Sequence, residues 1–152
     1  PVHSVEVVPS SGVLDRLISP DFDPWTQALL EKELPDEAVA SMGSSAGCQD
    51  SRARIIRYED REVEVEASMC GSGVLVLSDT YYPGWRVWMD GREAELLRVN
   101  HALRGVFLPE GKHSQVFRFA PMVLRIGWAV TVTALMVSAV VVLIDARRAP
   151  GG

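Results

Sequence analysis

The sequence is poor in the residues of metal sites and lacks the common catalytic motifs. Its 152 residues include two cysteines and three histidines. His3, His101 and His113 lie far apart without metal-type spacing, so surface or turn positions are expected for them. There is no glycine-rich phosphate loop, nucleophile elbow or HExxH motif. We therefore expect no catalytic residue, no metal and no cofactor in this chain.

Basic residues are too few for a nucleic-acid-binding protein. Residues 1–121 hold 12 basic and 19 acidic side chains, and the remainder holds three arginines and one aspartate, for a net charge of −5. Nucleic acid requires a basic face, so it is excluded as a partner. The first residue is proline, and no signal-peptide pattern follows. These features favour a fragment of a longer protein.

Short strands with turn signals between them dominate residues 53–119. The segment Arg61–Ala67 alternates valine or alanine with glutamate, which places one face on a core and leaves Glu62, Glu64 and Glu66 in water. This spacing predicts an all-β fold for residues 1–121, an antiparallel, jelly-roll-like β-sandwich. The other predicted strands are 2–8, 25–34, 55–58, 74–77, 85–89, 94–99, 105–108 and 115–119, and helix periodicity fits 25–34 about as well.

The chain is organised around the aromatic segment from Asp79 to Glu93. Pro83-Gly84 predicts a type II turn, in which glycine accepts a positive φ. Asp90-Gly91 is the signal of a two-residue type I′ hairpin. Trp85 is expected to fill the core behind the first turn.

Two N-terminal segments carry weaker signals. Ser10-Ser11 precedes an apolar stripe that predicts a short helix from Gly12 to Ile18. Residues 35–52 are rich in Gly, Ser, Asp and Glu without periodicity, which predicts a flexible loop.

Composition changes at Pro121. Ile126–Ile144 carries no charge over 19 residues, about 28 Å of helix, which matches the hydrocarbon core of a bilayer. We therefore expect a transmembrane helix over 122–145. The arginines Arg147 and Arg148 outnumber Arg125 on the other flank, which favours a cytoplasmic tail at 146–152 and residues 1–121 on the exported side.

Several of these motifs also occur together in a known family. The run Val74–Trp85, then Asp90-Gly91, Arg98-Val-Asn100, Leu108–His113 and Val116–Phe119 before an apolar helix resembles the C-terminal end of YfhO-type bacterial membrane proteins. These proteins look like type C glycosyltransferases that use polyprenyl-phosphate sugars. The resemblance implies the exported, non-catalytic end of a cell-envelope glycosyltransferase, with the bilayer and an upstream transmembrane body as partners. In an exported domain, Cys48 and Cys70 would be able to pair.

Six side chains form a candidate glycan site. Aromatic rings offer a platform for a sugar, and neighbouring polar groups offer contacts: Tyr81, Tyr82, Trp88, Asp79, Asn100 and Arg104. In the alternative interpretation the aromatics pack in the core and Asp79 caps a turn. Besides the non-catalytic domain, two functions stay open: a module that binds cell-envelope glycan or lipid-linked sugar, and a structural lid on the membrane body. The module requires Tyr81, Tyr82 and Trp88 exposed in a flat arrangement, and the lid requires them covered.

Overall fold

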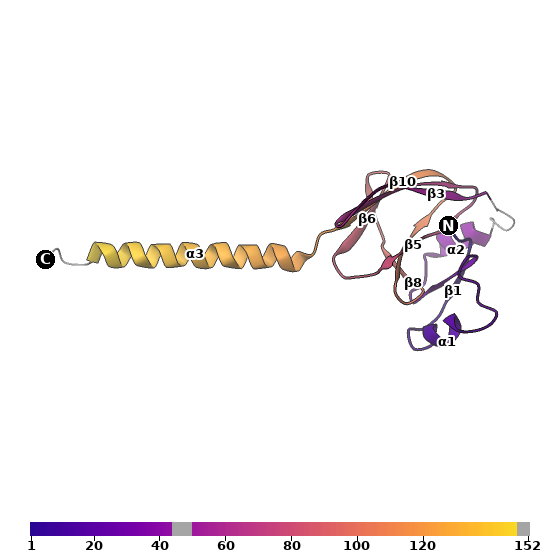
Figure 1. The fold of residues 1–152 in the computed structure, drawn as a ribbon, viewed down its shortest axis with the longest axis horizontal. Helices are drawn as coiled ribbons and strands as arrows, with labels where there is room; N and C mark the ends of the chain where they lie inside the picture. Colours follow the sequence, from indigo (N-terminus) through magenta and orange to yellow (C-terminus); the bar gives the residue numbers. More distant parts are fainter. Residues whose placement is uncertain (44–49, 149–152) are drawn as a thin grey trace. The chain divides into compact units, whose positions relative to one another are not determined.

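The computed structural model describes residues 1–43 and 50–148. The chain divides into two compact units, Pro1–Ala120 and Pro121–Gly152. The first unit is built mainly of strands, and the second contains one helix, α3 (Met122–Arg148) (Figure 1). The all-β expectation for the first unit is therefore confirmed.

Ten strands form two five-stranded sheets in the described residues of the first unit. The first sheet has the order β1-β2-β8-β9-β5, and the second has the order β3-β4-β10-β6-β7. Every pair is antiparallel except β1 with β2. The strand bounds are β1 Ser4–Val7, β2 Gln27–Leu30, β3 Arg52–Glu59, β4 Glu62–Met69, β5 Gly73–Thr80, β6 Trp85–Met89, β7 Arg92–Ala94, β8 Leu97–Val99, β9 Leu103–Leu108 and β10 Gly111–Phe119.

The two sheets share a core. One apolar cluster joins inward residues of β4, β6 and β10 to inward residues of β5 and β9, including Val63, Leu75, Val87, Val106 and Phe117. Since this cluster draws on both sheets, they pack face to face, as the sandwich prediction required. Along β4 the valines are buried while the glutamates between them are partly or fully exposed, which confirms the predicted alternation.

The other face of the first sheet is also covered. Val74 and Val99 on that face pack with Leu34, Ala38 and Met42 in a second cluster. Ala38 and Met42 belong to a helix, α2 (Asp36–Gly43), within the segment 35–52 that the sequence predicts to be a flexible loop. That prediction was wrong for 36–43, because the acidic residues in the first turn stabilise the helix and its apolar side chains pack on the sheet. Residues 44–49 lie outside the described part.

The segment 94–99 was expected to be one strand and is two. Ala94 ends β7, which pairs with β6 in the second sheet, whereas Leu97 begins β8, which pairs with β9 in the first. Glu95 and Leu96 carry the chain across, and Leu96 packs against the shared core. This crossover ties the two sheets together at one end.

The start of the chain closes the first sheet. β1 lies parallel to β2, and Val2 exchanges two backbone hydrogen bonds of 2.8 Å with Val74 of β5. The predicted helix over 12–18 is present as α1 (Val13–Leu17). Among the described strands, β3 and β7 form the edges of the second sheet.

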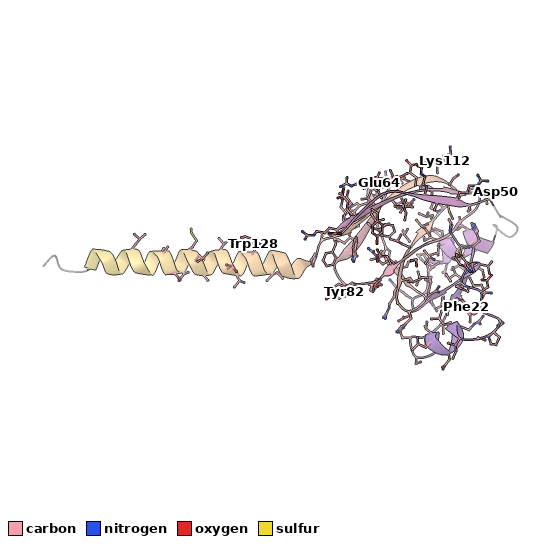
Figure 2. The ribbon with its side chains drawn as sticks, in the orientation of Figure 1. Phe22, Asp50, Glu64, Tyr82, Lys112 and Trp128 are labelled. Carbon is pink, nitrogen blue, oxygen red and sulfur yellow. The ribbon has the colours of Figure 1, made fainter. Side chains whose placement is uncertain are left out.

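The second unit is the helix α3. From Ile126 to Val140 every side chain is exposed, including Trp128, which Figure 2 labels on the helix. In the part of the chain that the structure describes, no helix is both long and apolar enough to cross a membrane. The transmembrane prediction for 122–145 is therefore not supported, although the helix itself is present.

Cys70 follows β4 and is held in a disulfide bond. Its predicted partner, Cys48, lies outside the described residues. The backbone N–H of Cys70 also donates to Ser51 Oγ at 3.1 Å.

Candidate functional site

A β-bulge brings two of the predicted site residues together. Leu77 on β5 pairs with Arg104 on β9, but the next paired residues are Thr80 and Leu103, so β5 contains two extra residues at this point. Asp79 is one of them. Bulges of this kind redirect side chains, often beside functional sites, and here the carboxylate of Asp79 forms an ion pair with Arg104 Nη2.

Arg104 is almost wholly buried, with 1% of its side chain exposed. Its side chain lies on the same inward face of β9 as those of Val106 and Leu108. Its guanidinium lies 3.7 Å from the ring centre of Trp85, which belongs to the opposite sheet. Burial lowers the pKa of Arg104 from its ordinary value, and Asp79 opposes that effect. Within the described residues, Nε and Nη1 have no hydrogen-bond partner.

Asp79 joins three elements. Its Oδ2 accepts a hydrogen bond from the Tyr58 hydroxyl at 3.1 Å, while Oδ1 accepts from the Thr80 N–H at 3.0 Å. The hydrogen bond to Asp79 raises the pKa of Tyr58. The predicted turn-capping role of Asp79 fits the bond to Thr80, but the contacts with Tyr58 and Arg104 place it at a polar centre that also faces solvent.

These residues line a pocket of about 410 Å³. Tyr82 is 61% exposed and lies on the surface of the first unit (Figure 2), and Tyr58 is 62% exposed. Trp85 is partly buried and touches Phe119, with ring centres 5.4 Å apart. We call this pocket the Tyr82 pocket; it is lined by Tyr58, Glu59, Asp60, Asp79, Thr80, Tyr82, Trp85, Arg104 and Phe119.

The other predicted site residues lie elsewhere. Tyr81 lines a different pocket of about 310 Å³, together with Ser10, Glu31 and Arg98. Trp88 lies on β6 with its ring centre 5.6 Å from the guanidinium of Arg118. The three rings proposed as one platform, Tyr81, Tyr82 and Trp88, are therefore not assembled into one.

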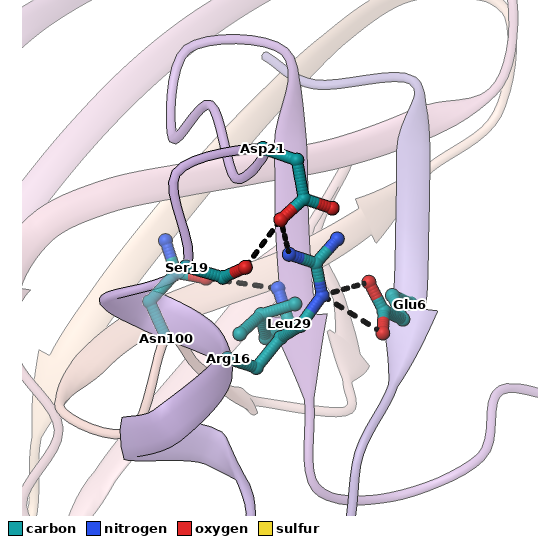
Figure 3. A network of polar contacts seen from close by, with 6 residues as sticks. All are labelled: Glu6, Arg16, Ser19, Asp21, Leu29 and Asn100. Carbon is teal, nitrogen blue, oxygen red and sulfur yellow. Dashed lines mark hydrogen bonds and ion pairs between the residues drawn. The ribbon is translucent and has the colours of Figure 1, made fainter.

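Asn100 makes a structural contact with a residue that is distant in the sequence. Its Oδ1 accepts the Leu29 N–H at 2.8 Å, which links the turn before β9 to β2 (Figure 3). Asn100 has φ of +47°, a conformation that asparagine tolerates better than most residues. Figure 3 also shows Arg16, which contacts Glu6 at 2.8 Å and Asp21 at 3.3 Å and so connects α1 to β1 and to the following loop.

The turn residues adopt the predicted backbone. Gly84 has φ of +109°, and Asp90 and Gly91 have φ of +51° and +81°, as the two turns require. Pro83 lies beside Gly84 and forms a bridge with Trp85. Asp90 accepts the Ser114 N–H at 2.9 Å and contacts His113 Nδ1 at 2.7 Å, and these contacts hold the pKa of Asp90 below its ordinary value.

A larger hollow, of about 710 Å³, includes this His113–Asp90 pair and lies along β3, β4 and β10. Arg52, Arg54 and Lys112 also line it, and His113 supplies its one aromatic ring. We favour the Tyr82 pocket as the functional site because it combines exposed aromatic rings with an ion pair between a buried arginine and a partly exposed aspartate. Among the described residues, no cluster of His, Cys, Asp or Glu could hold a metal ion.

Sequence reasoning missed Tyr58 and Phe119, which come from strands distant in sequence. The sequence does, by contrast, predict that two of the aromatic residues lie apart. Trp85 and Trp88 are three apart on one strand and so point to opposite faces.

A family model described as bacterial membrane protein YfhO matches residues 42–131, more than half of the chain. No curated protein and no solved structure gives a significant match.

Proposed function

Because the chain belongs to the YfhO family of bacterial membrane proteins, we propose that its first unit is a non-catalytic, glycan-binding domain on the exported side of the membrane. In this proposal the domain positions a cell-envelope carbohydrate for a membrane glycosyltransferase of which the chain is a part. The helix α3 would contact the membrane or neighbouring apolar helices.

The Tyr82 pocket carries this proposal. A sugar presents apolar C–H faces and a rim of hydroxyl groups. The exposed rings of Tyr58 and Tyr82 offer flat apolar surfaces on which the C–H faces can stack. The carboxylate of Asp79, which is 29% exposed and held in place by the buried Arg104, offers a charged hydrogen-bond acceptor for the hydroxyl groups. The pocket volume, about 410 Å³, lies within the range of small-molecule sites.

The contacts of Asp79 in the pocket support the non-catalytic part of the proposal. Asp79 is engaged by Arg104, Tyr58 and Thr80, so its carboxylate is not poised as a free acid or base. Purified chain is therefore expected to give no turnover of a polyprenyl-phosphate sugar. Measurable transfer by this chain alone would contradict the non-catalytic assignment.

The surface of α3 supports the membrane contact. Large apolar side chains are exposed along it, including Trp128 at 72%, Leu135 at 65% and Met136 at 66%. A helix that is apolar on all sides requires an apolar environment. The family description agrees with that environment.

Glycan binding is tested with the 152-residue chain in a detergent that has no sugar headgroup. Cell-envelope oligosaccharides are titrated into it by calorimetry. Tyr82→Ala is expected to weaken binding by roughly ten-fold or more, because a stacking ring is lost. Tyr81→Ala is the matched control, since the neighbouring ring lines another pocket and its removal should leave the affinity unchanged.

Equal effects of the two alanine variants would place the ligand elsewhere. Asp79→Asn and Tyr58→Phe separate the polar contacts from the rings, because both keep the shape of the side chain. If no oligosaccharide binds the parent chain, the glycan-binding proposal fails.

A structural lid is the second candidate. Ile18 is 80% exposed and Trp25 is 87% exposed, although both are large and apolar. Exposed apolar groups of this kind mark contact surfaces. If Trp25→Ala disrupts association with the membrane body while Tyr82→Ala does not affect function, the lid is favoured.

A further inference from the structure

A second pocket lies at the junction of the two apolar clusters, separate from the Tyr82 pocket. Its volume is about 360 Å³. One wall comes from α2 and the residues before it, with Leu34 and Ala38, and the facing walls come from Met89 of β6, Ala94 of β7 and Val106 of β9. We call it the α2 cavity.

The α2 cavity draws on both clusters without being filled by either. Val106 belongs to the core between the sheets, and Met89 and Ala94 pack against that core. Leu34 and Ala38 belong to the cluster on the other face of the first sheet. The hollow opens to the surface, and its walls come from residues that belong to two packed clusters, so a ligand can enter it without displacing either cluster.

The lining selects an apolar ligand. The walls of the α2 cavity are mainly aliphatic, and Met89 adds a flexible thioether that adapts to the shape of a ligand. The small side chains of Ala38 and Ala94 keep the space open from opposite walls.

The rim sets the charge of the ligand. Glu37 and Glu95 line the opening, and both are exposed. Lys32 pairs with Glu95 at 2.5 Å, so it is not available to a ligand. Glu37 and Glu95 outnumber Lys32, so the rim is net negative and an anionic headgroup is disfavoured there.

We propose that the α2 cavity binds an aliphatic chain that bears an uncharged headgroup. The hydrocarbon lies between α2 and strands β6 to β9, and the headgroup lies at the rim beside Glu37 and Glu95. This site is independent of the Tyr82 pocket and does not require glycan binding there.

The test uses the 152-residue chain in a fluorinated surfactant, whose tails mix poorly with hydrocarbon, with methyl groups of Ala, Leu and Val labelled for NMR. The probe is 1-decanol. Saturable shifts are expected at the methyl groups of Ala38, Leu97 and Val106, with direct magnetisation transfer from the decanol chain to them. Sodium decanoate should bind more weakly, because the two rim carboxylates repel its charge.

Two filling variants provide the controls. Ala38→Phe from α2 and Ala94→Phe from β7 should each weaken decanol binding by roughly ten-fold or more. Ala102→Phe makes the same change at an exposed residue outside the cavity and should bind as the parent does. The proposal is overturned if decanol perturbs only methyl groups of α3, or if the filled variants bind as tightly as the parent. Should either variant fail to fold, the transfer signals in the parent chain decide alone.

Discussion

Arg104 is the residue on which the candidate site depends most. A guanidinium with 1% exposure is rare unless it is paired, and here a carboxylate neutralises it while an aromatic face covers it. Removing one partner of a buried ion pair costs more than the pair contributes, because the other charge stays behind. Asp79 and Trp85 therefore support the site as well as line it.

Trp85→Ala should destabilise the first unit by about 3 kcal/mol, the lower end of the range for such truncations, since the ring is only partly buried. The loss includes the contacts with Phe119 and with the guanidinium of Arg104. Chemical denaturation measures it. Trp88→Ala, on the other face of the same strand, should cost less than about 1.5 kcal/mol. Equal losses for the two variants would contradict the inward placement of Trp85.

Tyr58 should titrate above the ordinary tyrosine value of about 10, because its hydroxyl donates to Asp79 and ionisation would place a second negative charge there. A pKa raised by folding gives stability that is present below the unfolded value and is lost as the pH rises through the folded one. NMR of ring-labelled tyrosine measures this pKa. In Asp79→Asn it should fall, and an unchanged value would rule out the hydrogen bond as the cause.

At the scale of single residues, the sequence predicted local backbone and missed long-range contacts. The positive φ values of Gly84, Asp90 and Gly91 follow from dipeptide chemistry alone. The partnership of Tyr58 with Asp79 depends on a bulge in β5 and on the position of an edge strand. No local pattern encodes it.

Among the elements, the hairpin between β6 and β7 offers a test by pH. The contacts of Asp90 with His113 and the Ser114 N–H lower its pKa, so they stabilise the fold above the ordinary aspartate pKa and lose that effect as the pH falls through the folded value. Asp90→Asn should therefore flatten the acid limb of the thermal midpoint plotted against pH. Asparagine tolerates the positive φ, so the turn is kept. An unchanged acid limb would contradict this role of Asp90.

Helix α2 and the split of 94–99 show where pattern reading fails for whole elements. The segment 36–43 has a polar surface and a weak apolar stripe. The helix is stable because it packs on the first sheet. Residues 94–99 look like one strand, but Leu96 packs into the shared core and the chain changes sheets there. In both cases tertiary packing overrides local preference.

At the scale of the whole molecule, the proposed placement of the first unit on the exported side can be tested in intact cells. Glu33 is exposed, so Glu33→Cys, in a background where both native cysteines are serine, should react with a membrane-impermeant thiol reagent. As a control, the same variant is labelled after the membrane is breached, where its cysteine should react whichever side it occupies. Reaction only after the breach would place the first unit in the cytoplasm and remove the geometry of the proposed function.

The strand that leads into α3 has a mechanical consequence. β10 lies in the middle of its sheet, paired with β4 on one side and β6 on the other. Backbone bonds from Phe119 to Arg61 and from Ala120 to Gly84 hold the chain up to the last residue of the unit. A pull through α3 therefore loads two ladders at once, while tension at the N-terminus meets the Val2 bridge and then the single ladder between β1 and β2. Under load the first unit should unfold from its N-terminal end first, while β10, which leads into α3, stays paired in its sheet.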